Sequence, residues 1–158
     1  MPGTDAVWRA LYARARDMRG IRARVGVLAE KGGSVTQQGS DLTLVELAAV
    51  HEFGSPAANI PERSFLRSTF RERSAKALAS MVAKITKAIL ANKVTVKQGV
   101  NMLGAWGATE VKNTITQTEI PPPLKPATIA AKGSKRPLVD TGQLLNSITW
   151  VVEDDGKK

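Results

Sequence analysis

Between residues 61 and 91, apolar side chains recur at steps of three and four positions, the spacing that places them on one face of an α-helix. Phe65, Phe70 and Ile85 belong to this series. Pro61 stands at its start, where proline is favoured because the first helical residue does not need its amide hydrogen. The pattern predicts one long helix over about 61–91, against which the rest of the chain must pack.

Two segments far apart in the sequence have the pattern of β-strands. Residues 21–29 alternate between apolar and other side chains, as in a strand with one buried face. Residues 149–153 are mostly β-branched or aromatic. The predicted fold class is therefore α+β: a small antiparallel sheet (about 21–29 pairing with about 149–153) packed against a long helix (about 61–91) and several shorter helices.

The shorter helices have recognisable ends. A first helix over residues 6–18 is expected to stop at Gly20. Thr43 and Glu46 form a capping box, in which each side chain accepts the other residue's backbone N–H. The helix that they open is expected to end at Gly54 as a left-handed cap.

A second capping box and a later cap predict two more helices. Thr95 and Gln98 have the spacing of a capping box and open a helix that Gly104 and Gly107 are expected to interrupt. Asp140 is placed to cap a short helix that runs through residue 148.

The length of 158 residues predicts a single α+β domain over 1–158. Within it, the polar, glycine-rich residues 31–42 are expected to form a mobile loop. Residues 119–137 are proline-rich and basic, and residues 154–158 are a polar tail that we expect to fray.

The composition restricts the classes of function. The formal net charge of +9 favours an anionic partner, which could be nucleic acid, a lipid surface or an acidic protein. The chain has no cysteine, which excludes disulfides and thiolate zinc sites. Lys76, Lys84 and Lys87 interrupt the most apolar stretch, so we expect no membrane span.

The residue types that carry catalysis are sparse. His51 is the only histidine, so a Ser-His-Asp or Cys-His device would have to use it. We expect His51 instead to be a partly buried residue near a helix end. The carboxylates are scattered along the chain and predict no catalytic pair, cofactor or metal site. They include Glu46, Glu52, Glu62, Glu72, Glu110 and Asp140.

Three arginines recur at four-residue steps and would form a stripe on the predicted long helix. Arg63, Arg67 and Arg71 form this set. The stripe is either a solvated face or a surface that pairs with acidic residues of a neighbouring subunit or faces DNA. The candidate interface or DNA-channel residues are Arg63, Arg67, Arg71, Lys132, Lys135 and Arg136.

Three short motifs carry a family resemblance. Residues 50–54 read VHEFG, residues 60–67 read IPERSFLR, and residues 137–148 read PLVDTGQLLNSI. Together and in this order, they resemble the virion-morphogenesis proteins of tailed phages, in the neck and tail-completion group. Ser64 departs from the proline that such proteins commonly have, which should loosen the helix start slightly.

The resemblance implies a non-enzymatic structural protein of the virion neck or tail, assembled in the host cytoplasm. Its implied partners are copies of itself in a ring around the DNA passage, neighbouring phage connector and tail proteins, and passing double-stranded DNA, with no membrane. The motifs are expected to fix a loop between helices, anchor the long helix on the sheet, and cap the last helix. The residues concerned are His51, Phe53, Gly54, Pro61, Phe65, Leu66, Asp140, Thr141, Gly142 and Leu144.

Two other classes of function remain as alternatives. A basic nucleic-acid-binding module would explain the net charge and predicts strong, salt-dependent DNA binding by a single subunit. A hydrolase that uses His51 predicts that its replacement by alanine abolishes an activity.

Overall fold

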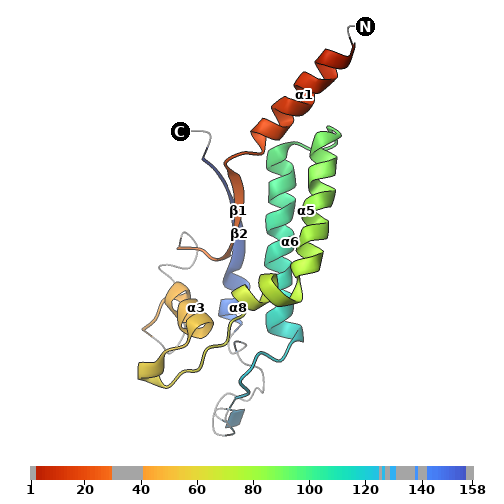
Figure 1. The fold of residues 1–158 in the computed structure, drawn as a ribbon. Coiled ribbons are helices and arrows are strands. Elements are labelled where there is room, and N and C mark those ends of the chain that lie inside the picture. Colours follow the sequence, from red (N-terminus) through yellow and green to blue (C-terminus); the bar gives the residue numbers. More distant parts are fainter. Residues whose placement is uncertain are drawn as a thin grey trace.

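The computed structural model describes residues 3–29, 41–124, 126, 129–130, 138 and 142–155 (Figure 1). Its elements are α1 (Gly3–Asp17), β1 (Ile21–Val27), α3 (Leu44–Phe53), the 3₁₀-helix η1 (Pro56–Ala58), α4 (Leu66–Ser68), the π-helix η2 (Thr69–Arg73), α5 (Ala75–Leu90), α6 (Val96–Gln117), α8 (Gln143–Ser147) and β2 (Ile148–Asp154). The fold class is α+β, as predicted. Most of the predicted loop at 31–42 and the last three residues of the predicted tail lie outside the described residues.

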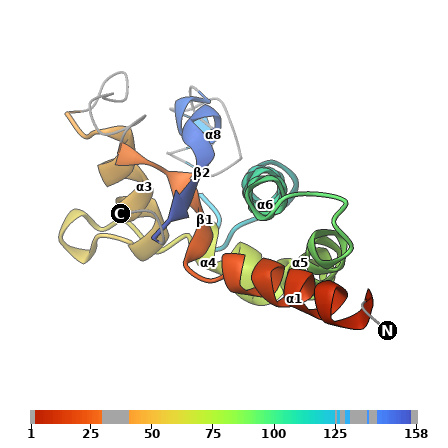
Figure 2. The same cartoon turned by 90° about the horizontal axis from the view of Figure 1, so that it is seen from above.

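The two-stranded sheet joins the two predicted strand segments. β1 and β2 are antiparallel, with Ile21 opposite Asp154 and Val25 opposite Trp150. Val25 and Trp150 lie toward α6, and α6 separates the sheet from α5 (Figures 1 and 2). The prediction that residues 21–29 pair with residues 149–153 is therefore confirmed, with slightly different ends.

The other face of the sheet carries ion pairs. Glu153 bonds to Arg22 at 2.9 Å and to Arg24 at 2.8 Å, and Arg22 also pairs with Asp155 at 2.8 Å. The two arginines are exposed, while their neighbours along β1 are half-buried. Exposed pairs of this kind contribute little stability each, so the sheet depends on its packing against α6.

The prediction of one helix over 61–91 is wrong. Residues 61–64 are not helical, so Pro61 is not a first helical residue, and the longest helix is α6. The helical run begins at Leu66, widens into the π-helix η2, and breaks at Ser74 before α5 begins. At the break, the Ser74 N–H bonds to the Thr69 carbonyl at 2.7 Å, and its hydroxyl bonds to Glu110 at 2.5 Å.

The apolar spacing did not reveal this break because buried apolar residues recur on both sides of it. Phe65 is fully buried before the break, and Ile85 and Ile89 are buried after it. Spacings of three and four residues are therefore compatible with two helices in series as well as with one.

α6 is continuous, so the prediction that glycines interrupt it is also wrong. Thr95 and Gln98 form the predicted capping box at its start. A Cβ on Gly104 would overlap Cδ1 of Trp150 and lie 2.9 Å from its Cγ, and a Cβ on Gly107 would lie 3.1 Å from Val25. These glycines let the sheet approach the helix closely. No helix in the described ranges is long and apolar enough to cross a bilayer.

Replacing Gly104 by alanine is expected to lower the free energy of unfolding by about 2 kcal/mol, because displacing the Trp150 ring costs more than the gain in helix propensity. Urea unfolding followed by circular dichroism measures the change. Thr109→Ala, at an exposed position of the same helix, is the control. A more stable Gly104→Ala protein would show that the ring does not pack against this glycine.

The core lies where α3, α4, α6, α8 and β2 meet. Phe65, Val111, Ile115 and Ile148 are almost completely buried there, and Leu144 of α8 joins them. Phe65 and Leu66 therefore contact the core as predicted, but they anchor the short helix α4 rather than a long one.

The first helix extends away from this core. α1 begins earlier than predicted, at Gly3, and ends before Gly20, which has a φ of 77°. Its N-terminal end lies beyond α5 and α6 (Figure 1). Arg14 attaches it to the body by donating from Nη1 to the Leu90 carbonyl at 2.9 Å.

Candidate interface site

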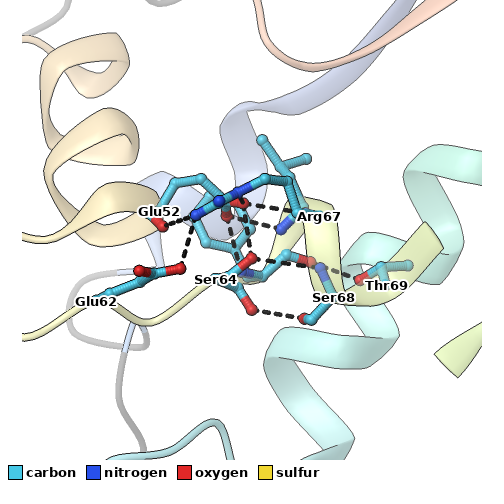
Figure 3. A network of polar contacts seen from close by, with 8 residues as sticks. Glu52, Glu62, Ser64, Arg67, Ser68 and Thr69 are labelled. Carbon is cyan, nitrogen blue, oxygen red and sulfur yellow. Dashed lines mark hydrogen bonds and ion pairs between the residues drawn. The ribbon is translucent and has the colours of Figure 1, made fainter. Parts of the chain in front are cut away.

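Two of the three motif segments meet at one carboxylate. Glu52, in the last turn of α3, is only 3% exposed. Its Oε2 accepts the backbone N–H groups of Phe65 and Leu66 at 2.8 and 2.9 Å, and its Oε1 accepts that of Arg67 at 3.0 Å (Figure 3). These amides open α4, so a side chain from one helix satisfies the first turn of another.

Arg67 completes the site from the other side. Its Nε donates to Glu52 Oε1 at 2.9 Å, and its Nη2 donates to the Glu52 carbonyl at 2.8 Å and to Glu62 Oε1 at 2.7 Å. Its guanidinium also lies 4.7 Å from the centre of the Phe53 ring. Phe53 is exposed, so this contact is at the surface and Glu52 lies beneath it.

Ser64 strengthens the helix start instead of loosening it. Its hydroxyl donates to Glu52 Oε1 at 2.8 Å, and its oxygen accepts the Ser68 N–H at 3.3 Å. Proline could make neither bond because it has no hydroxyl. Serine at this position therefore gives the helix start two hydrogen bonds that proline could not make.

The loop between α3 and α4 brings the two motif segments together. Gly54 has φ 75° and ψ 172°, so it is not the left-handed cap that we predicted, although its φ is positive. The Arg63 N–H bonds to the His51 carbonyl at 2.8 Å, and Ser55 pairs with Ile60 as a short bridge. Gly54 and residues 60–63 thus form a sharp return that places residues 64–67 over Glu52.

The pKa of Glu52 is the result of opposed effects. Burial, the largest effect, raises the pKa of the carboxyl group because it disfavours the charged form. The backbone N–H groups of Leu66 and Arg67, followed by the Ser64 hydroxyl and the Arg67 side chain, stabilise the charged form. Together they outweigh burial and hold the pKa below its ordinary value of 4.5.

This depressed pKa predicts a loss of stability in acid. The carboxyl protonates more readily in the unfolded chain than in the folded one, so its contribution is complete above pH 4.5 and declines as the pH falls through the folded-state pKa. We expect the difference in unfolding free energy between the native chain and Glu52→Gln to shrink below pH 4.5. Urea unfolding of both proteins between pH 7 and about pH 3 measures it, and a constant difference would contradict the assignment.

The predicted arginine stripe does not exist. Arg63 is only 7% exposed, and it donates from Nε to the Pro122 carbonyl at 3.1 Å and from Nη2 to that of Pro123 at 3.5 Å. Burial lowers the pKa of its guanidinium. Arg67 is bound to Glu52, and only Arg71, on the π-helix, is exposed. The residues fail to form one face because the helix begins after Arg63 and changes its period after Arg67.

The remaining candidate residues are in different places. His51 is half-buried near the end of α3, as expected. Gly142 precedes α8 with a φ of 75°, and Leu144 points into the core. Lys132, Lys135, Arg136, Asp140 and Thr141 lie outside the described residues.

The arrangement leaves Glu52 little capacity for chemistry. Donors from four successive residues, 64–67, occupy both of its oxygens, so it has no free position for a substrate or a metal ion. Elsewhere in the part of the chain that the structure describes, no group of three or more acidic or histidine side chains could hold a metal ion. The site is suited to fixing two helices relative to each other.

The role of Glu52 was not predicted from the sequence, where it is one of several scattered carboxylates. A signal was present: an acidic residue at the end of one helix is followed, beyond a glycine turn, by the start of another helix, whose N–H groups attract a carboxylate. The exposed aromatic residues Trp8 and Tyr12 of α1 were not predicted as candidate site residues either.

Comparison of the chain with protein-family models, with curated proteins and with solved structures found no match.

Proposed function

We propose that this chain is a non-enzymatic structural component of a tailed bacteriophage particle, at the neck, the head-tail connection or the completed end of the tail, and that it assembles as a ring around the DNA passage. The observation that carries the proposal is that the motif residues make structural contacts within the chain. The segments that resemble the phage proteins, residues 50–54 and 60–67, meet at Glu52 in a joint made of buried hydrogen bonds. These hydrogen bonds fix the relative positions of two helices, and a subunit of a symmetric assembly needs such a defined shape.

Exposed apolar side chains support an assembling subunit. Val7, Trp8 and Tyr12 on α1, Phe53 at the Glu52 joint and Met102 on α6 are all more than half exposed. Large apolar side chains that gather on a surface mark contacts with other proteins more often than they mark sites of reaction. In an assembled particle, such residues would be covered by other subunits.

The basic surface would face an anionic partner. Arg71 and Arg73 on η2 and Lys76 on α5 are exposed within six positions of each other. In the proposed ring, they would lie toward passing DNA or toward acidic residues of an adjoining component. With Arg63 and Arg67 occupied inside the chain, this segment takes the place of the predicted arginine stripe.

Two measurements test the proposed function. Sedimentation velocity and negative-stain electron microscopy of the purified full chain should show a closed oligomer with a central opening, and mass spectrometry of purified phage particles should detect the chain as a constituent. The triple variant Arg71→Glu, Arg73→Glu and Lys76→Glu separates ring formation from joining. It should form the ring as the native chain does, but it should fail to bind the neighbouring particle components. A chain that is absent from particles and does not self-associate at any concentration would overturn the proposal.

The net charge of +9 favours one alternative, a nucleic-acid-binding module. It predicts that the isolated subunit binds duplex DNA and that its affinity falls by close to one power of the salt concentration for each phosphate contacted. Gel-shift titrations at several salt concentrations, beside the sedimentation data, separate the two functions. A monomer with strong DNA binding supports the alternative.

A further inference from the structure

The outward face of α1 carries four residues in one stripe. Asp5, Trp8, Tyr12 and Arg16 are separated by three, four and four positions, which keeps them on one side of a helix. Trp8 is 58% exposed, Tyr12 is 73% exposed, and both charged residues are exposed. The two aromatic rings contact each other, with centres 6.5 Å apart.

The opposite side of α1 holds the helix to the body. Leu11, Arg14 and Met18 are half-buried there, and Arg14 bonds to the Leu90 carbonyl at the end of α5. The attachment uses this side and the C-terminal half of the helix, so helix spacing places the aromatic stripe on the side turned away from the attachment. Figure 1 shows that α1 extends beyond α5 and α6. Within the described residues, no packing partner covers Trp8 and Tyr12.

The exposed apolar surface is large for a single helix. Trp8 and Tyr12 leave about 300 Å² of mostly apolar side chain in water, taking about 150–250 Å² for each large side chain and the exposed fractions above. Val7, which is 60% exposed, lies on the side of Leu11 and Met18 and is not part of the stripe. Patches of this size on soluble proteins mark interaction sites, and tryptophan and tyrosine are the side chains that most often dominate the binding energy of an interface.

The order of charges along the stripe determines what fits it. It begins with a carboxylate, continues with two aromatic rings and ends with a guanidinium group. The exposed Arg9 lies at its edge and donates to the Asp5 carbonyl at 3.2 Å, and Arg16 lies 3.9 Å from the exposed Asp17. A second copy of α1 in antiparallel orientation places its Arg16 opposite Asp5, and its Tyr12 opposite Trp8. The parallel orientation would place like charges together, and antiparallel helix dipoles also attract each other.

We propose that α1 is a docking helix for a second copy of this chain, which binds through the antiparallel face formed by Asp5, Trp8, Tyr12 and Arg16. This contact is two-fold symmetric and closes on two copies, so it differs from the head-to-tail contacts that build a ring. It does not depend on the proposed function. A ring would need a further surface, and the α1 contact would link its members in pairs or link two rings.

The aromatic pair is tested first. Sedimentation velocity of the full native chain should show an association between two copies, and Trp8→Ser/Tyr12→Ser should abolish it. Both positions are exposed, so circular dichroism should show a folded variant. Val82→Ser, which removes an exposed apolar side chain from α5, is the matched control and should associate as the native chain does. A ring whose mass is unchanged by the double variant would overturn the α1 contact while leaving the proposed function in place.

A charge exchange tests the orientation. Asp5→Arg and Arg16→Asp should each weaken the association by about ten-fold, because each change places like charges opposite each other twice in the dimer. The variant with both changes should regain the native affinity, and a mixture of the two single variants should form mixed dimers. A native chain that remains monomeric, single changes without effect, or a double change no tighter than the single ones would each refute the proposal.

Discussion

Glu52→Leu is expected to lower the free energy of unfolding by about 3 kcal/mol. The substitution removes a buried acceptor and leaves the N–H groups of Phe65, Leu66 and Arg67 without their partner, and each buried unsatisfied group is costly. It also leaves the Arg67 side chain without the carboxylate that fixes it. Urea unfolding at neutral pH, fitted with a common slope, measures the loss.

Glu62→Gln is the matched control for this experiment. Glu62 binds the same guanidinium group, at 2.7 Å, but its side chain is 55% exposed. Exposed ion pairs contribute little, so the control should unfold almost as the native chain does. Equal losses for the two variants would show that Arg67 alone, rather than the helix start, determines the stability of the joint.

Gly54→Ala should be about as damaging, with a loss of about 3 kcal/mol. At φ 75° and ψ 172°, the backbone of Gly54 is in a region that residues with a side chain almost never occupy. A Cβ there would also lie 2.8 Å from the Glu62 nitrogen and 3.1 Å from the Ile60 carbonyl oxygen. Backbone atoms cannot rotate away as a side chain can, so the return between α3 and α4 would have to open.

Gly142→Ala is the reference for a positive φ without a close backbone contact. Gly142 has the same φ of 75° with ψ −3°, and among the described residues a Cβ there would meet the Asn146 side chain, at 3.8 Å. Its replacement should therefore lose only the conformational part, about 1 kcal/mol. Urea unfolding of both variants gives the comparison, and a Gly54→Ala loss no larger than that of Gly142→Ala would mean that the return tolerates a side chain.

The elements that could be predicted from the sequence are those set by local chemistry. The capping boxes at Thr43 and Thr95 and the strand pattern from Ile21 are confirmed, because each depends on residues within a few positions or on a simple alternation. The partner of β1 was also found, since residues 149–153 were the other segment with β-forming composition.

The wrong predictions concern positions where a contact between distant residues determines the local structure. Glu52 determines that the helix starts at Leu66 rather than at Pro61, and no pattern around Pro61 contains that information. Gly104 was interpreted as a helix breaker, although it makes room for a tryptophan far along the chain. Arg63 was assigned to a surface because the helix assumed for it had the wrong start.

The order of the strands along the chain affects how the protein is made. β1 leaves the ribosome before its partner β2, which follows more than a hundred residues later. Until β2 has been synthesised, Ile21–Val27 has no partner strand in its own chain. Contacts between such distant segments also form slowly. A product of interrupted translation that lacks Ile148–Asp154 therefore lacks the sheet. It would present an unpaired strand to the cell's proteases and chaperones, so only chains that include β2 can form the sheet.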